Sequence, residues 1–351
     1  MSNERGGAGT LSRREFLSRT ALAAGAVSAA AAVAGGLGEA MTGGAAGATP
    51  RSSALTSMSL QLPWLENAQA AGEFIAESEG YYRKNGLNVK LLSGGPNVSI
   101  EPVVTAGTAL VGLSSADVCA RARHEGAPLK IIGAQYQKNP YAVISPANKP
   151  IVSPRGLIGK SIGVSASNLT VYELMLKINN IDESKVTRVP VQFDPTPLVN
   201  GEVDAWLGYI TSDAVTLVLK NFPIHSFLLS NFGYHIWGDV YETTEEAIAK
   251  KRSTLVAFLR AERQGWARDF KDFALGDSLV LKKYGKNLGL SAKQELLQSK
   301  QQVALMLTPT TKSHGLFWMS DAGIAQNLAT IRLTGIPAAR NMFDNSLLQE
   351  L

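Results

Sequence analysis

The stretch that decides the fold is residues 58–97, which read MSLQLPWLENAQAAGEFIAESEGYYRKNGLNVKLLSGGPN. Residues 59–62 read as a short strand, and residues 68–82 carry apolar side chains at the spacing of a helix. Basic side chains and a glycine at residues 83–86 favour a helix end there. Residues 87–92 then alternate like a second strand. The stretch therefore predicts one βαβ unit, whose two strands run parallel with a right-handed crossover.

Two loops of this unit follow strands at the same edge of the predicted sheet. They are residues 64–67 and residues 93–97. In open parallel sheets, ligands bind beyond the carboxyl ends of the strands. Trp64 offers an aromatic face at this edge, and the glycines of the second loop leave backbone amides accessible. Because neither loop carries an obvious nucleophile or metal ligand, the sequence indicates a site that holds a molecule without transforming it.

Three segments of this stretch carry a resemblance to a known family. Residues 62–67, residues 80–89 and the loop of Gly94, Gly95 and Pro96 resemble the opening of solute-binding proteins of ABC importers. The resemblance is to the NMT1/THI5-like group, which binds thiamine-precursor pyrimidines and riboflavin. The SsuA-like binders of nitrate, sulfonates and taurine are similar at a greater distance.

This resemblance covers about residues 58–270. It implies an α/β protein with the two-lobe type II periplasmic-binding-protein fold. In that fold each lobe is a mostly parallel sheet flanked by helices, a two-strand hinge joins the lobes, and no cofactor is bound.

Composition excludes several other classes of protein. The 351 residues are 45% hydrophobic and 18% charged, which suits a globular chain large enough for two lobes. The net charge of +5 comes without a long basic run, so nucleic-acid binding is not indicated. Cys119 is the only cysteine, which leaves no intrachain disulfide and no CxxC metal site. The histidines lack metal-ligand spacing and stand at His124, His225, His235 and His314.

The first fifty residues read as an export signal. Residues 12–17, SRREFL, match the twin-arginine pattern, and a moderately apolar run follows at residues 21–37. Small residues occupy positions 43–48, as a cleavage site requires. This region contains no cysteine, which argues against a lipid anchor. A membrane anchor and a disordered tail are the alternatives, but the apolar run is shorter than the roughly 20 residues of a membrane span. We expect residues 1–50 to be a twin-arginine signal peptide and the protein to be periplasmic.

The remaining chain is expected to form two lobes. We assign residues 51–144 together with residues 236–351 to lobe I, and residues 145–235 to lobe II, inserted between them. The Pro-rich turn at residues 145–150 is expected to carry the first crossing, and residues 233–241 the return. Lobes joined by two crossings can close around a ligand.

The candidate ligand-binding residues share one feature, a place at or just beyond the carboxyl end of a predicted strand. They are Trp64, Asn67, Gln69, Gly95, Asn97, Ser115, Tyr136, Ser165, Asn168, Trp206 and Tyr209. Aromatic faces would stack on a flat ring, while amides and hydroxyls would hydrogen-bond its edges. Structural roles remain open for three of them: Trp64 as a plug of the lobe, Trp206 as a core residue, and Ser115 as a helix cap.

A long helix is predicted over residues 245–270, and it contains one unusual position. Leu255, Leu259, Glu262 and Trp266 follow one another at helical spacing along one face. A buried carboxylate needs a partner, so we expect Glu262 to be partly exposed beside this apolar stripe.

The function expected from these observations is ligand capture for an ABC importer, without catalysis, cofactor or metal. The ligand is expected to be a neutral heterocycle, a pyrimidine precursor or a riboflavin-like flavin, because nitrate or a sulfonate would favour Arg or Lys in the loops. Binders of nitrate, sulfonate, taurine or an aromatic acid remain the alternative. Expected partners are the small molecule and an ABC permease of the inner membrane, with no nucleic acid, and the protein is expected to be a monomer.

Two other classes use the same architecture. Thiamine-pyrimidine synthases resemble this family, but they are cytosolic and carry a cysteine-rich run, whereas this chain has one cysteine and an export signal. A ligand-sensing module of a membrane receptor also remains open.

Overall fold

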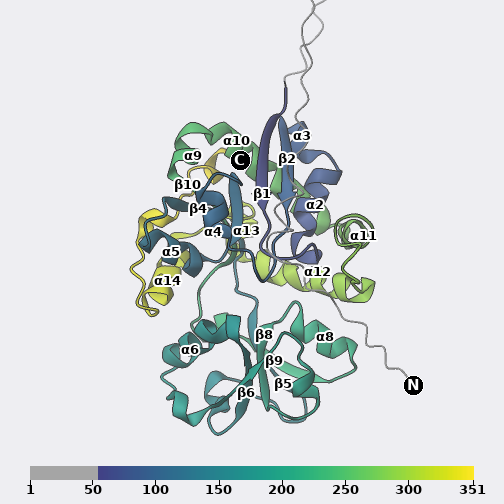
Figure 1. Ribbon diagram of the computed structural model, residues 1–351, viewed down its shortest axis with the longest axis vertical. Helices are drawn as coiled ribbons and strands as arrows, with labels where there is room; N and C mark the ends of the chain where they lie inside the picture. Colours follow the sequence, from purple (N-terminus) through teal and green to yellow (C-terminus); the bar gives the residue numbers. More distant parts are fainter. Residues whose placement is uncertain (1–53) are drawn as a thin grey trace, which may run out of the picture. The chain divides into compact units, whose positions relative to one another are not determined.

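The computed structural model describes residues 54–351, so the predicted signal peptide lies outside the described residues. Its strands form two five-stranded sheets (Figure 1). The first sheet has the order β2-β1-β3-β10-β4 and contains β1 (Thr56–Gln61), β2 (Leu87–Leu92), β3 (Val111–Ser114), β4 (Leu129–Tyr136) and β10 (Gly238–Thr244). Strand β1 pairs in parallel with β2 and with β3, which confirms that the two strands of the opening unit run parallel.

The second sheet is built from the middle of the chain. It has the order β7-β6-β8-β5-β9 and contains β5 (Tyr141–Pro146), β6 (Ser161–Ser165), β7 (Thr187–Val191), β8 (Ala205–Tyr209) and β9 (Ile224–Leu228). Its α-helices are α6 (Leu169–Ile178), α7 (Thr196–Val199) and α8 (Asp213–Leu219), and Figure 1 shows α6 and α8 on opposite sides of this sheet.

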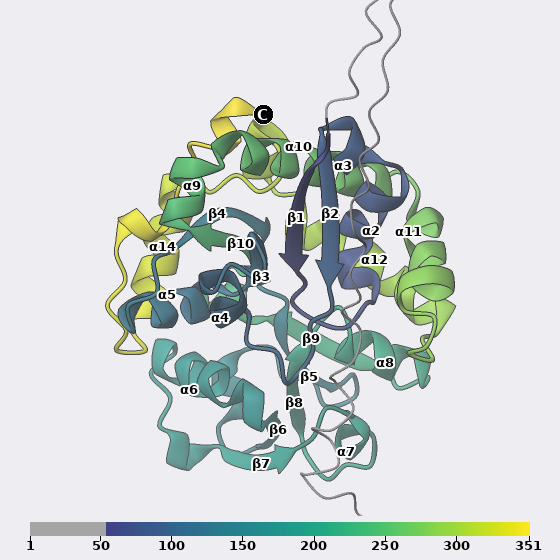
Figure 2. The same ribbon diagram turned by 45° about the horizontal axis from the view of Figure 1, so that its top comes forward.

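The other α-helices pack around the first sheet, as Figure 2 shows. They are α2 (Ala71–Ser78), α3 (Tyr81–Lys84), α4 (Ile100–Thr105), α5 (Ala116–His124), α9 (Glu245–Lys250), α10 (Arg252–Asp269), α11 (Phe273–Leu279), α12 (Ala292–Met306), α13 (Pro309–His314) and α14 (Asp321–Arg332). Two sheets flanked by helices confirm the predicted α/β class. Between residues 54 and 351, no helix combines the length and the apolar character that crossing a membrane requires.

One strand in each sheet runs against the others. Strand β10 is antiparallel to β3 and β4, and β5 is antiparallel to β8 and β9. Each of these strands is the first that the chain forms after it passes from one sheet to the other. Their amino-terminal ends therefore lie at the sheet edges where the neighbouring strands have their carboxyl ends.

The assignment of residues 141–144 to lobe I was wrong. Strand β5 contains these residues and pairs with β8 and β9 of the second sheet. The chain passes between the sheets at residues 137–140 instead of residues 145–150, and it returns at residues 229–237. An apolar run gives the same local signal in either sheet, because the pattern reports burial and does not identify the pairing partner.

Both long helices predicted from the apolar spacing are interrupted. The first becomes a 3-10 turn, η1 (Ala68–Ala70), followed by α2 and α3, with Gly80 between the two helices at a φ of +72°. Glycine adopts this left-handed conformation without steric penalty, so the chain turns there. The second is divided at Lys251 into α9 and α10.

Helices α2 and α10 approach each other closely through two glycines. A Cβ atom at Gly265 would lie 2.1 Å from the backbone oxygen of Gly72, and one at Gly72 would lie 2.4 Å from the Trp266 ring. Both distances are shorter than any packed contact, so the absence of side chains permits this crossing. The prediction for Glu262 was wrong, because it is fully buried between these helices.

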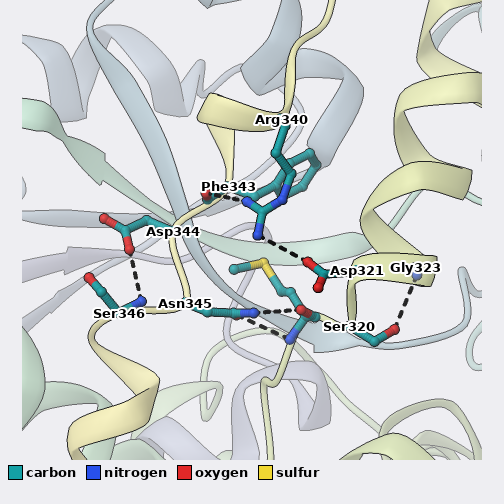
Figure 3. A network of polar contacts seen from close by, with 9 residues as sticks. Ser320, Asp321, Gly323, Arg340, Phe343, Asp344, Asn345 and Ser346 are labelled. Atoms are coloured by element: carbon teal, nitrogen blue, oxygen red, sulfur yellow. Dashed lines mark hydrogen bonds and ion pairs between the residues drawn. The ribbon is translucent and has the colours of Figure 1, made fainter.

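The C-terminal segment is tied to the first sheet by polar contacts (Figure 3). Phe343 forms a parallel bridge with Ile131 of β4. Asn345 donates to the backbone oxygen of Met319 at 2.6 Å and accepts from the amide of the same residue at 3.3 Å. These contacts cover the edge of the first sheet next to β4.

Candidate functional site

The candidate site lies where the carboxyl ends of some strands pair with the amino-terminal ends of the antiparallel strands. In the second sheet Tyr209, the last residue of β8, pairs with Tyr141, the first residue of β5. In the first sheet Tyr136, the last residue of β4, pairs with Gly238, the first residue of β10. The antiparallel strands thus add their own first residues to the edge that the carboxyl ends already form.

The second sheet contributes an aromatic group held by one amide. The Tyr141 ring meets Tyr209 edge to face with centroids 4.6 Å apart, and it meets Tyr234 at 6.3 Å. The Tyr141 hydroxyl donates to Oδ1 of Asn168 at 3.0 Å, and the Nδ2 atom of Asn168 donates to the Leu207 backbone oxygen at 3.3 Å. Both ends of the amide are engaged, so Asn168 fixes the orientation of Tyr141.

The first sheet contributes a buried carboxyl group and an amide. Nε2 of Gln69 donates to Oδ2 of Asp239 at 2.7 Å. Asp239 is 6% exposed, and burial raises its pKa to about 7, although the Gln69 hydrogen bond acts in the opposite direction. Its φ of +46° is unusual for a residue with a side chain. Such backbone conformations persist where the surrounding structure enforces them, and they concentrate at functional sites.

Charged and polar groups of the first sheet affect the pKa of a tyrosine in the second sheet. Burial raises the pKa of the Tyr209 hydroxyl well above its usual range, and Tyr141, Asp239, Tyr234 and Tyr136 raise it further. Tyr136 and Asp239 belong to the first sheet, whereas Tyr141 and Tyr209 belong to the second. Side chains from both sheets therefore lie near one another. We call this group the shared region, and it consists of Tyr136, Tyr141, Tyr209, Tyr234 and Asp239 with the amides of Gln69 and Asn168.

A second aromatic contact also joins the two sheets. The Trp64 ring, in the loop after β1, meets the Phe193 ring, in the loop after β7, with centroids 6.2 Å apart and planes at 66°. Phe193 is 56% exposed, while Trp64 is half-buried. This pair is therefore a more solvent-exposed contact between the two sheets.

The loop at residues 93–97 forms a hydrogen bond with the backbone of Trp64. The Gly94 amide donates to the Trp64 backbone oxygen at 3.0 Å. A Cβ atom at Gly94 would lie 2.4 Å from the backbone oxygen of Leu62, so this position requires glycine. Gly95 has a φ of +139°, and the side chain of Asn97 is exposed.

Some predicted site residues have structural contacts that account for them. The Asn67 side chain accepts from the Gln69 amide at 2.9 Å and caps the turn η1. Ser115 stands at the first turn of α5, and its hydroxyl donates to Oδ1 of Asp117 at 2.5 Å.

Three further predicted residues are buried. Trp206 lies in the core of the second sheet and donates from Nε1 to Oδ1 of Asp213 at 3.1 Å. The Tyr136 hydroxyl donates to Oε1 of Gln302, and Ser165 Oγ lies 3.1 Å from Ser167 Oγ. Of the predicted set, the structure brings Gln69, Tyr136, Asn168 and Tyr209 into the shared region.

Sequence reasoning missed three residues of this region, namely Tyr141, Tyr234 and Asp239. It also missed Phe193, which contacts Trp64 elsewhere between the two sheets. The search considered only the carboxyl ends of strands, whereas Tyr141 and Asp239 stand at the starts of antiparallel strands. Tyr234 lies in the return connection between the sheets. An available signal was the Gly238-Asp239 pair at the start of strand β10.

Two cavities lie on the described part of the chain. One, of about 210 Å³, is lined by both connections between the sheets and by α14, and it includes Lys138, Ser230 and His235. The other, of about 220 Å³, lies beside Phe74 and Tyr284 of the first sheet's helical layer. Residues 54–351 contain no group of His, Cys, Asp and Glu side chains arranged to hold a metal ion.

Comparison with known proteins adds curated relatives. The chain is 26% identical over 220 residues to the riboflavin-binding protein RibY of Chloroflexus aurantiacus, which covers 61% of this chain and 62% of that protein. It is 24% identical over 278 residues to the formylaminopyrimidine-binding protein of Halalkalibacterium halodurans, covering 77% of this chain and 82% of that one. The match thus spans less than two thirds of the riboflavin-binding relative.

Solved structures share the fold. The periplasmic aliphatic sulphonate binding protein SsuA from Escherichia coli superimposes with a TM-score of 0.62 at 14% identity, covering 79% of this chain and 86% of that chain. The family described as NMT1/THI5 like matches residues 67–272, which is more than half of the sequence. These residues include both strands that run antiparallel and the whole of the second sheet. The chain therefore belongs to the NMT1/THI5-like family, as its opening segments predicted.

Proposed function

We propose that this protein is the solute-binding component of an ABC import system and captures a small aromatic heterocycle between its two sheets. The observation that carries the proposal is the shared region itself, in which Tyr209, packed against Tyr141 in one sheet, lies within electrostatic range of Asp239 of the other. Relatives that bind riboflavin and formylaminopyrimidine support the choice of a heterocycle.

The side chains of this region suit a flat ring with polar edges. Aromatic rings stack on such a ligand, and Tyr209 and Trp64 provide faces from the two sheets. The Gln69 amide hydrogen-bonds the ligand's polar edge, while Asn168 holds Tyr141 in its orientation. The Asp239 carboxyl group, which receives one hydrogen bond from Gln69, accepts a further one from a ligand N–H group.

Binding is coupled to closure of the two halves of the chain. The connections at residues 137–140 and 229–237 act as the hinge, and the ligand favours the closed state because only that state contacts it from both sides. The closed protein then docks on a permease of the inner membrane. In this proposal the protein is exported through the twin-arginine pathway and works as a periplasmic monomer without catalysis.

The ligand class is tested by a thermal-shift screen of residues 51–351 against pyrimidines, flavins, aliphatic sulfonates and nitrate. A molecule that binds only the native state raises the melting temperature with its concentration. We expect a concentration-dependent rise with a pyrimidine or a flavin. A rise only with sulfonates or nitrate would contradict the proposed ligand class. Anions of this kind favour Arg or Lys side chains, and the residues proposed for the site include neither.

A further inference from the structure

Two glutamates are buried side by side in the core of the first sheet's helical layer. Glu73 of α2 and Glu262 of α10 both have no exposed surface, at the place where Gly72 and Gly265 let the helices approach closely. Burial raises the pKa of both carboxyl groups, and each lies near enough to the other for Glu262 to raise that of Glu73 further. The proposed ligand site contains neither residue.

Around these carboxyl groups, acceptor oxygens outnumber the protons available to the Tyr241 hydroxyl. The Tyr241 hydroxyl oxygen lies 3.2 Å from Oε1 of Glu73, 3.1 Å from Oε2 of Glu262 and 3.1 Å from Oε1 of Gln135. A phenol hydroxyl has one proton to donate, so it satisfies only one of these three oxygens. Gln135 cannot supply a second proton there, because its Nε2 end donates to the Gln69 backbone oxygen at 3.4 Å. A proton on one of the two carboxyl groups would supply the donor that is missing here.

The other groups that face the pair add donors but no positive charge. The Tyr82 hydroxyl donates to Oε1 of Glu262, and Nε1 of Trp266 donates to Oε1 of Glu73 at 3.4 Å. Asp239, in β10, raises the pKa of Glu73, and Glu77, farther along α2, acts on Tyr82.

Basic side chains on neighbouring segments donate to other groups, although Nη2 of Arg263 is buried without a hydrogen-bond partner among residues 54–351. Arg260 and Arg263 of α10 donate to the backbone oxygens of Glu350 and Leu316, and Lys283 donates to Ser78 Oγ. Among the ion pairs of residues 54–351, none includes Glu73 or Glu262. The uncompensated negative charge of a fully ionised pair would be expensive to bury.

The network around these carboxyl groups ends in the candidate site. Tyr241 contacts Gln135, and Gln135 donates to the backbone of Gln69. The side chain of Gln69 in turn donates to Asp239 at 2.7 Å. A change in protonation at the helix crossing would thus alter the hydrogen bonds that position Gln69.

We propose that Glu73 and Glu262 share a proton that holds Gln135 and Gln69 in the binding-competent arrangement, so that losing this proton weakens ligand capture. Glu73 and Glu262 are positioning residues in this view, since they act through Tyr241 and Gln135. The ligand part of the proposal rests on the proposed function, whereas the shared proton does not.

The shared proton is tested without any ligand, by the free energy of unfolding from pH 5 to pH 9. A carboxyl group with a raised pKa binds its proton in the folded state and releases it on unfolding, so stability falls as pH rises through that window. One such proton changes the unfolding equilibrium about tenfold per pH unit. Glu262→Gln keeps a neutral donor in place, and we expect it to make the profile less steep, although Glu242 and Asp269 still contribute a slope. The exposed control Glu79→Gln should leave the profile unchanged.

Glu73→Gln is the second variant, and it should make the profile less steep in the same way. If both glutamine variants fold and retain the wild-type pH slope, the shared proton is refuted. If both variants fail to fold, infrared absorption decides in a variant in which Glu242, Asp269 and Asp239, whose pKa values are also raised by burial, are replaced by their amides. A protonated carboxyl band that remains in this variant at pH 7 supports the proposal, and its absence overturns it.

The ligand part is tested by the dissociation constants of riboflavin and formylaminopyrimidine between pH 5.5 and pH 8.5. We expect wild-type affinity to fall about tenfold or more over this range and Glu262→Gln to show a flat profile. Asp239→Asn separates the two sources of pH dependence, because it should retain the dependence if the pair causes it. A dependence that survives Glu262→Gln and disappears in Asp239→Asn, or a flat wild-type profile, overturns the coupling. Binding of neither compound refutes the proposed ligand and leaves the stability test to decide the shared proton.

Discussion

Trp206 and Tyr209 stand three positions apart on β8 but have different surroundings. Trp206 is 2% exposed in the core of the second sheet, whereas Tyr209 ends the strand beside Tyr141. We predict that Trp206→Ala lowers the free energy of unfolding by about 3–5 kcal/mol, because it leaves a cavity. Denaturant unfolding measures this loss. A variant with wild-type stability would show that Trp206 is not a core residue.

Phe193 offers a single-residue test of the contact between the sheets. Because its side chain is 56% exposed, Phe193→Ala should change stability by less than about 0.5 kcal/mol. Loss of the contact with Trp64 should weaken ligand binding and shift the tryptophan emission of the ligand-bound protein. Val152, which is 60% exposed, provides the matched control Val152→Ala. Equal ligand affinity in both variants would contradict a role for Phe193 in closure.

Among individual site residues, those at the carboxyl ends of parallel strands could be predicted from the sequence. Tyr209 ends a strand and Asn168 follows one, and both lie in the shared region, because parallel strands bring their carboxyl ends to one edge. Asp239 and Tyr141 were not predictable in this way, since they start strands whose antiparallel direction depends on long-range pairing. Trp206 follows the same local pattern as Tyr209, and only packing distinguishes them.

The crossing of α2 and α10 is the element whose geometry depends most on small residues. A Cβ atom at Gly265 would overlap the backbone oxygen of Gly72. We predict that Gly265→Ala lowers stability by about 1–3 kcal/mol, in spite of alanine's higher helix propensity, because the helices must separate. The exposed neighbour Gln264 gives the control Gln264→Ala. A stabilised Gly265→Ala variant would contradict the close packing.

Helix boundaries show what local patterns can and cannot define. The apolar spacing predicted helical structure at residues 68–82 and 245–270, and both segments are mainly helical. The breaks at Gly80 and Lys251 were not predicted, because an apolar stripe continues across a turn when both helices face the same core. Glu262 lies on such a stripe, and its phenol partners come from α3 and β10, which no local pattern reveals.

Buried carboxyl groups should make the whole molecule more stable at mildly acidic pH. Burial raises the pKa of Glu242 and of Asp269 to about 8. Each group binds more protons in the folded chain than in the unfolded one between about pH 4 and pH 8. The free energy of unfolding should therefore fall as pH rises through this window, by about 1.4 kcal/mol per pH unit for each such group at most.

Melting temperatures at pH 5.5 and pH 8.5 measure this dependence. We predict a lower value at pH 8.5, and a smaller difference in Asp269→Asn than in the exposed control Glu125→Gln. Higher stability at pH 8.5 than at pH 5.5 would show that these carboxyl groups are ionised in the folded protein.

For the molecule as a whole, the sequence predicted two α/β halves but misplaced the point where the chain passes between them. The opening unit correctly predicted the parallel pair of β1 and β2 in the first sheet, because its strands and helix are neighbours in sequence. The passage at residues 137–140 was missed, since strand β5 carries no local mark of the sheet that it joins.

The central claim is that ligand binds between the sheets, and calorimetric titration tests it most directly. Riboflavin and formylaminopyrimidine would be titrated into residues 51–351 of the wild type, of Tyr209→Ala and of Tyr81→Ala, which removes a comparable ring from α3. We predict saturable binding of one compound to wild type and to Tyr81→Ala, weakened by about 1–3 kcal/mol in Tyr209→Ala. Equal affinity in all three proteins would contradict a site between the two sheets.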